Sequence, residues 1–114
     1  MGSEDQVVFS RMDGDVVYRL KGAFTDSKES YGLLEKVRED VAGGVPRVVL
    51  DLTNVPHLTS GGIGITCACY TSLLNAERRF ALVGVDERSR MMFTAVGLWD
   101  RLEHFETLDE ATRA

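Results

Sequence analysis

The spacing of hydrophobic and polar residues changes along the chain, and in three stretches it predicts strands. Residues 48–52 are almost continuously apolar and β-branched, as in a strand that is covered on both faces. Before them, the stretches 7–12 and 16–21 flank Asp13-Gly14-Asp15, and Asp-Gly between two such stretches is a strong hairpin signal because glycine supplies the positive φ of a tight turn. We therefore predict an antiparallel pair of strands followed by a buried central strand.

Helical periods lie between and after these strands. Apolar residues recur at steps of three or four in residues 26–42 and 61–76, and we expect them to face the core. They are Tyr31, Leu34, Val37 and Val41 in the first helix and Ile63, Cys67, Tyr70 and Leu74 in the second. Two further helices are predicted over residues 87–96, after a cap at Asp86, and over 107–112, from the capping box Thr107-x-x-Glu110. In the first of these, the residues expected to face inward at least in part are Met91, Met92, Ala95 and Val96.

The alternation of strands and helices predicts an α/β fold. Parallel strands are expected at residues 47–52, 79–85 and 103–106, so the sheet is mixed and has four to five strands, with the helices packed mainly on one face. With 114 residues, 44% of them hydrophobic, the chain suits a single domain over residues 7–114. The polar residues 1–6 are expected to be a disordered N-terminus.

Charge and hydropathy exclude some partners. The chain has 13 basic and 18 acidic residues, a net charge of −5, and no basic cluster that would suit a phosphate backbone. No apolar run approaches the roughly 20 residues of a membrane helix, and residues 1–5 lack the pattern of a secretory signal. We expect a cytoplasmic protein that neither binds nucleic acid nor inserts into a membrane.

The cysteines and histidines do not predict a metal site. Cys67 and Cys69 are two residues apart on a predicted helix, so their side chains point about 200° apart and suit neither a disulfide nor a metal pair. We expect Cys67 to be buried and Cys69 to be the more exposed of the two. His57 and His104 have no metal-binding spacing around them.

The junction between the central strand and the second long helix carries two adjacent hydroxyls, Thr59 and Ser60. A hydroxyl here is explained either as an N-cap, which accepts from a free backbone N–H, or as a phosphoacceptor at the positive end of a helix dipole. The glycines that follow, Gly61, Gly62 and Gly64, each cost roughly 1 kcal/mol relative to Ala in a helix. They indicate close packing against the sheet, with Gly64 inward, or room for a partner to approach Ser60, or both.

The same glycines do not indicate an enzyme. A dinucleotide fingerprint, G-x-G-x-x-G, would need a third glycine where Cys67 stands, and the Gly-Lys-Ser/Thr of a Walker loop is absent. No pair of carboxylates and no Ser/His/Asp order suggests catalysis. We therefore expect no catalytic residue, no cofactor and no enzyme activity.

Residues 49–64 read Val-Leu-Asp-Leu-Thr-Asn-Val-Pro-His-Leu-Thr-Ser-Gly-Gly-Ile-Gly, and this run resembles the STAS domain family, the anti-sigma factor antagonists. The family pattern is a hydrophobic strand that ends in Asp-Leu-Ser/Thr, a short loop, and Asp-Ser-Ser/Thr-Gly-Leu-Gly at the start of a helix. Matched residue by residue, Asp51 falls on the strand-end aspartate, Ser60 on the phosphorylated serine, and Gly62, Ile63 and Gly64 on the Gly-Leu-Gly. Thr59 stands where the family usually has Asp, and Gly61 where it has a second Ser or Thr. The resemblance extends over about residues 7–112.

The resemblance implies a partner switch. The unphosphorylated protein would bind a serine kinase that is also an anti-sigma factor, phosphorylation of Ser60 would end the binding, and a serine phosphatase would reset the protein. Thr59 is the alternative phosphoacceptor. The residues implied to contact the partner are Asp51, Thr59, Ser60, Gly61, Gly62, Ile63 and Gly64. We expect a monomer or a weak dimer.

A second interpretation belongs to another functional class. The chain would then be a non-switching STAS module that serves as a scaffold subunit of a signalling or lipid-transport assembly. Thr59 and Gly61 favour it slightly, because the usual Asp-Ser-Ser/Thr triplet is incomplete here.

Overall fold

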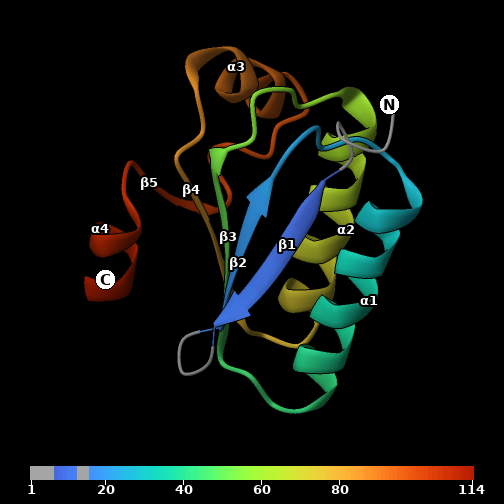
Figure 1. Cartoon of the computed structure of the whole chain (residues 1–114). Helices are drawn as coiled ribbons and strands as arrows, with labels where there is room; N and C mark the ends of the chain where they lie inside the picture. Colours follow the sequence, from blue (N-terminus) through green and yellow to red (C-terminus); the bar gives the residue numbers. More distant parts are fainter. Residues whose placement is uncertain (1–6, 13–15) are drawn as a thin grey trace.

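The computed structural model of the chain describes residues 7–12 and 16–114 and contains the predicted order of strands and helices (Figure 1). The elements are β1 (Val8–Met12), β2 (Val16–Lys21), α1 (Lys28–Ala42), β3 (Arg47–Asn54), α2 (Ser60–Asn75), β4 (Arg79–Val83), α3 (Glu87–Ala95), β5 (Glu103–Phe105) and α4 (Leu108–Arg113). Their bounds lie within two residues of the predicted ones. The predicted turn at Asp13-Gly14-Asp15 and the predicted disorder of residues 1–6 fall outside the described residues.

Within residues 7–12 and 16–114, one five-stranded sheet joins the strands in the order β1-β2-β3-β4-β5. β1 and β2 are antiparallel, as predicted, whereas the pairs β2–β3, β3–β4 and β4–β5 are parallel. β3 is the central strand, which explains why its residues are apolar on both faces. The loop that follows β3 therefore starts from the middle of the sheet.

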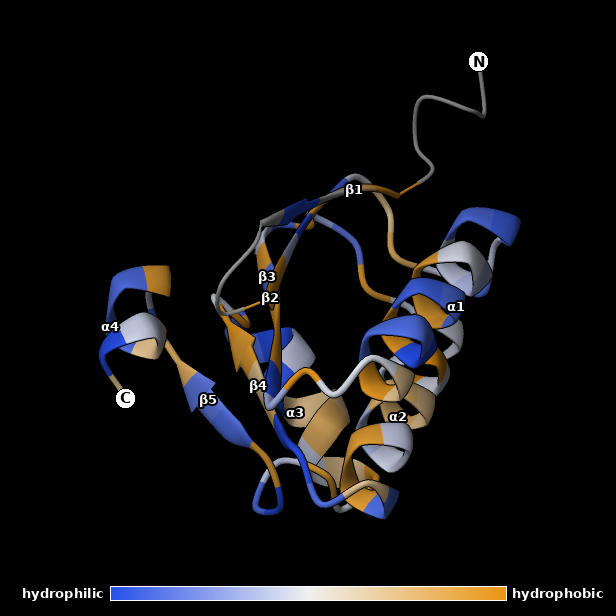
Figure 2. Cartoon of the chain, turned by 90° about the horizontal axis from the view of Figure 1, so that it is seen from below, coloured by the Kyte–Doolittle hydropathy of each residue, from blue (hydrophilic) through white to orange (hydrophobic). Residues whose placement is uncertain are grey.

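The helices cover the two faces of the sheet unequally (Figure 2). α1, α2 and α3 pack on one face, where Leu50 of β3 belongs to a large core with Val37, Leu73 and Phe93. α4 packs on the other face, where Val49 belongs to a small cluster with Ala111. The prediction of a mixed α/β sheet with helices mainly on one face is confirmed. Among the described residues, no helix has the length and apolar character that crossing a bilayer requires.

The expected inner stripe of α2 was correct at Ile63, which is buried, and Tyr70 is half-buried against the core, but the stripe was wrong at the other two positions. Thr66, Cys69 and Leu73 are buried, whereas Cys67 is half-buried and Leu74 is 53% exposed. Cys69, expected to be the more exposed cysteine, is fully buried, and this burial raises the pKa of its thiol to about 12. The helix is apolar on most of its circumference, so its periodicity alone does not determine which side faces the sheet.

The inner faces of α1 and α3 also differ in part from the expectation. In α1, Leu34 and Val37 are buried as expected, but Tyr31 is exposed and the neighbouring Leu33 takes an inward position. In α3, Ser89 and Phe93 are the buried residues. Of the four residues expected to face inward at least in part, Met92 is half-buried against the core. Ala95 is exposed, and Met91 and Val96 are 66% and 57% exposed, because this helix of nine residues turns only a narrow side toward the core.

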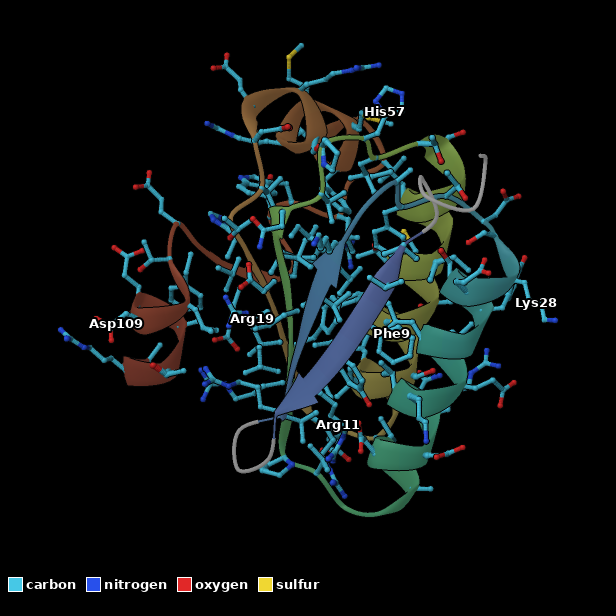
Figure 3. All side chains as sticks on the ribbon, in the orientation of Figure 1. Phe9, Arg11, Arg19, Lys28, His57 and Asp109 are labelled. Carbon is cyan, nitrogen blue, oxygen red and sulfur yellow. The ribbon has the colours of Figure 1, made fainter. Side chains whose placement is uncertain are left out.

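A polar cluster that the sequence analysis did not find ties β1 to the last turn of α1. The Asp40 carboxylate accepts hydrogen bonds from Arg11, at 2.7 Å from Nη2, and from the hydroxyl of the fully buried Tyr18. Figure 3 shows Arg11 beside this end of α1. Burial, together with the Asp40 hydrogen bond, raises the pKa of the Tyr18 hydroxyl, which therefore keeps its proton and remains a donor.

Candidate functional site

Thr59 caps α2, and its hydroxyl is used by the structure. The residue has an extended backbone (φ −102°, ψ 172°), and its Oγ1 accepts a hydrogen bond from the Gly62 N–H at 3.3 Å. The same hydroxyl donates to the Phe24 carbonyl at 3.4 Å. The capping explanation of the hydroxyl pair therefore applies to Thr59.

Ser60 is the first residue of α2, and it is exposed. Within the described part of the chain, its hydroxyl has no hydrogen-bond partner. Because Thr59 already satisfies the Gly62 N–H, the helix does not depend on the Ser60 hydroxyl. The structure thus separates two roles that share one sequence motif: Thr59 stabilises the helix start, and Ser60 presents a free hydroxyl at its positive end.

The loop before Ser60 is held by the segment that follows β2. Leu58 and Phe24 form a parallel bridge, in which the Phe24 N–H donates to the His57 carbonyl at 2.8 Å and the Thr59 N–H donates to the Phe24 carbonyl at 3.1 Å. Leu58 and Phe24 are also buried in the large core. These bonds continue the pairing of β2 and β3 beyond the strands and fix the place where α2 begins.

The three glycines of the first turns have different surroundings. A Cβ on Gly62 would overlap the Phe24 carbonyl oxygen, so glycine is required there for close packing. A Cβ on Gly61 would lie 2.8 Å from the Asp26 amide nitrogen and 2.9 Å from its carboxyl carbon. Gly64 is exposed, and a Cβ there would meet nothing within 4 Å. The expectation that Gly64 faces inward was wrong, since Gly62 is the residue packed against the chain.

Ser60 and Gly64 lie on one exposed face of α2, four residues apart. Ile63 and Gly62 are buried, and Thr59 and Gly61 are half-buried. Of the residues implied to contact a partner, Ser60 and Gly64 are therefore the two that are exposed. Packing does not explain a glycine at the exposed position 64, one turn into the helix. Because Gly64 has no side chain, the backbone beside Ser60 stays accessible.

Asp51 lies apart from this group. Strand alternation places it with Val49 on the face opposite α2, and it is only 5% exposed. Its Oδ1 accepts from the Thr53 amide at 3.0 Å and from the Thr53 hydroxyl at 2.6 Å, while its Oδ2 lies 3.6 Å from Arg19 Nε. The carboxylate thus shapes the end of β3, and the structure does not bring it to Ser60.

Thr53 in turn packs against Gly84 after β4. Gly84 has φ +70°, and a Cβ there would lie 2.9 Å from Thr53 Cα. Asp51 therefore orients the residue that keeps the ends of β3 and β4 close together.

Sequence reasoning missed Asp26 as a neighbour of the site. It precedes the α1 cap Ser27 and reaches α2 only through space, so no local pattern marks it. Helix α3 lies beyond the same end of the sheet (Figure 1). His57, in the loop before α2, lies on the side of α3 (Figure 3). The side chain of Met91 on α3 is exposed. A short, weakly amphipathic helix does not reveal which of its apolar residues stay outside.

The Ser60 hydroxyl is accessible for modification. Within the described residues, no general base contacts the Ser60 hydroxyl, whereas a self-activated nucleophile needs a base within hydrogen-bond reach. An exposed hydroxyl at a helix N-terminus instead suits modification by another protein.

Comparisons with known proteins show the family and the fold of the chain. The STAS domain family model matches residues 6–111. No curated protein sequence matches the chain significantly. Among solved structures, an anti-sigma factor antagonist from Mycobacterium paratuberculosis is 26% identical and superposes with a TM-score of 0.78 over 96% of this chain and 93% of that chain.

Two structures of SpoIIAA are more distant in sequence. The anti-sigma factor antagonist SpoIIAA in its unphosphorylated form is 21% identical, with a TM-score of 0.77 over 92% of this chain and 93% of that chain. The phosphorylated form of the Bacillus cell fate determinant SpoIIAA is also 21% identical, with a TM-score of 0.77 over 93% of this chain and 97% of that chain. At this identity the likeness bears on the fold alone. Because the family model spans nearly the whole chain, the protein belongs to the STAS domain family.

Proposed function

We propose that the protein is an anti-sigma factor antagonist whose binding to a serine-kinase anti-sigma factor is controlled by phosphorylation of Ser60. One observation carries the proposal: Thr59 caps α2, so the adjacent Ser60 hydroxyl is exposed and has no structural task. Unphosphorylated, the protein binds the kinase and displaces the sigma factor. It acts as a substrate and binding partner of other enzymes, with no catalytic step of its own.

A phosphate on Ser60 ends the complex by its charge. It adds about −1.5 to −2 charges and three acceptor oxygens at the centre of a surface that fits a neutral hydroxyl and the bare backbone of Gly64. Burying such a charge without a partner is costly. The kinase supplies ATP and magnesium, and a serine phosphatase restores the hydroxyl.

Thr59 is the weaker candidate for modification. It is half-buried, and its hydroxyl both accepts from Gly62 and donates to Phe24. Phosphorylation there would remove the α2 cap and break the link to Phe24, so it would change the fold locally as well as the charge. Ser60 can be modified without either loss.

The test is phosphorylation by the kinase-type anti-sigma factor encoded in the same genome, followed by intact-mass measurement and phosphosite mapping. We expect one phosphate on the wild type, one on Thr59→Ala, and none on Ser60→Ala, while Ser60→Ala still binds the kinase. A phosphate that persists in Ser60→Ala and disappears in Thr59→Ala would move the site to Thr59. No phosphate on the wild type would overturn the switch in favour of the non-switching scaffold subunit.

A further inference from the structure

The carboxylate of Asp26 lies beside the first turn of α2, although it belongs to the segment between β2 and α1. Its backbone nitrogen, Cβ and carboxyl carbon are 2.8, 2.9 and 2.9 Å from the position that a Cβ on Gly61 would take. Residue 61 directly follows Ser60. The Asp26 side chain therefore occupies the space that a side chain on residue 61 would need.

Asp26 is exposed and, within the described residues, forms no ion pair or hydrogen bond through its side chain. Its charge is not offset by a partner within the described residues, and it borders Gly61, the residue that follows Ser60. Like charges close together repel, and each disfavours the ionised form of the other. A phosphate on Ser60 would add negative charge one residue away from the position that the Asp26 carboxylate borders.

The segment that carries Asp26 is bound on both sides. Phe24 is tied to the loop before α2 by its hydrogen bonds to His57 and Thr59, and Ser27 caps α1 by accepting from the Ser30 amide at 3.3 Å. Because the hydrogen bonds of Phe24 hold the segment before Asp26 in place, a displacement of Asp26 would move the residue after it, the α1 cap Ser27.

We propose that the Asp26 carboxylate opposes a phosphate on Ser60 and so transmits phosphorylation from α2 to the start of α1. This inference rests on the proposed switch at Ser60 and extends it, since the partner would then detect the change on two helices. It also explains Gly61: a larger side chain there would displace the carboxylate that responds to the phosphate.

The test uses phosphoserine installed at position 60 during translation, in proteins that are otherwise wild type, Asp26→Asn or Glu35→Gln. Glu35 is an exposed residue of α1, so its substitution removes the same charge away from Ser60. ³¹P NMR measures the second pKa of the phosphate, which lies near 6 in the absence of neighbours. We expect Asp26→Asn to lower this pKa more than Glu35→Gln does, because a nearby carboxylate favours the less charged phosphate. Equal shifts would overturn the proposal.

Hydrogen exchange of backbone amides tests the transmission. With Asp26 present, phosphoserine at position 60 should speed exchange at Ser30, whose amide is held by the α1 cap, relative to the same protein with serine. In Asp26→Asn the acceleration should be smaller. An equal acceleration in both would show that the effect does not pass through Asp26. His57, in the loop before α2, also titrates. The phosphate titrations are therefore repeated in proteins that also carry His57→Gln, so that the measured shift reports on position 26 alone.

The two proposals fail separately. If the kinase ignores Ser60, the switch is wrong, yet the installed phosphate still confirms or overturns the role of Asp26. If the phosphate is insensitive to Asp26, the switch at Ser60 stands without transmission to α1.

Discussion

The adjacent hydroxyls of Thr59 and Ser60 have different structural roles, although the sequence alone does not distinguish them. Thr59 accepts from the Gly62 amide and donates to the Phe24 carbonyl, whereas Ser60, one residue later, points into solvent. The difference arises from the backbone: the N-cap residue is extended and turns its oxygen toward the first free amides, and the next residue is already helical. Stability and regulation can therefore be changed independently at neighbouring positions.

Substitution of each hydroxyl should show this division. Thr59→Ala should lower the free energy of unfolding by about 1 kcal/mol, as expected for a lost N-cap, and Thr59→Ser should recover most of it. Ser60→Ala should change it by less than about 0.5 kcal/mol, as at an ordinary surface position. Urea denaturation of the four proteins measures the differences. A larger loss in Ser60→Ala than in Thr59→Ala would contradict the assignment of the cap.

At the scale of elements, α2 is positioned by its glycines as much as by its apolar side chains. Gly62 lets the helix start approach the Phe24 carbonyl, and this contact sets the rotation that buries Cys69 in place of Cys67. Gly64, two residues later, makes no such approach. The same residue type thus serves packing at one position and accessibility at the other.

Alanine at the two glycines should have opposite effects on stability. Gly62→Ala should destabilise by several kcal/mol or prevent folding, because its Cβ overlaps backbone. Gly64→Ala should stabilise by up to about 1 kcal/mol, because alanine is the better helix former and the site is open. Thermal unfolding measures both. If the exposed backbone at Gly64 serves the partner, Gly64→Ala should also weaken kinase binding while the fold is more stable, and unchanged binding would argue against that role.

The link between β1 and α1 is a second feature at this scale. Asp40→Ala leaves the Tyr18 hydroxyl in the core without its acceptor, so it should lower the free energy of unfolding by about 1–3 kcal/mol. Glu39→Ala is the matched control, since Glu39 is the exposed neighbour and its loss should cost less than about 0.5 kcal/mol.

This link also predicts a pH dependence. The folded protein raises the pKa of Tyr18 above that of the unfolded chain, so the stabilisation is complete below about pH 10 and is lost as the pH rises further. Denaturation between pH 7 and 11 should show a steeper alkaline loss in the wild type than in Tyr18→Phe. Parallel curves for the two proteins would exclude Tyr18 as the cause.

At the scale of the whole molecule, one face of the sheet has three helices and the other has α4. The small cluster under α4 joins Val17, Val49, Ala81, Val83 and Ala111. Ala111 is the fully buried contact from α4, and its helix starts with the predicted capping box at Thr107 and Glu110. In the described part of the chain, a single short helix thus covers this face.

Ala111→Asp should open that face. A carboxylate placed among Val49 and Val83 has no partner there, so the helix should detach and the melting temperature should fall by several degrees. Thr112→Asp, one residue along on the exposed side of α4, is the control and should change little. Equal effects of the two substitutions would mean that α4 does not depend on this contact.

The strands and their order were predictable because their signals are local. The continuous apolar run at residues 48–52 marked the central strand, and Asp86, Gly97 and Thr107 marked helix ends where the structure has them. The rotation of α2 was not predictable, since that helix is apolar nearly all round and a contact with Phe24, 38 residues before Gly62, decides it. Asp26 beside Gly61 and Asp40 beside Arg11 are likewise contacts through space, which no spacing in the sequence records.

The order of the strands in the sheet has a consequence for how the protein folds. Each strand pairs with the strand that precedes it in the chain, from β1 to β5 without exception. No strand has to be inserted between two strands that are already paired. Each pair of neighbouring strands is connected either by a hairpin turn or by a segment that contains one helix. Because the rate of folding falls as contacting residues lie further apart in sequence, the sheet can grow outward from its first pair. The chain can thus form β3 and the loop toward Ser60 before β5 and α4 are in place.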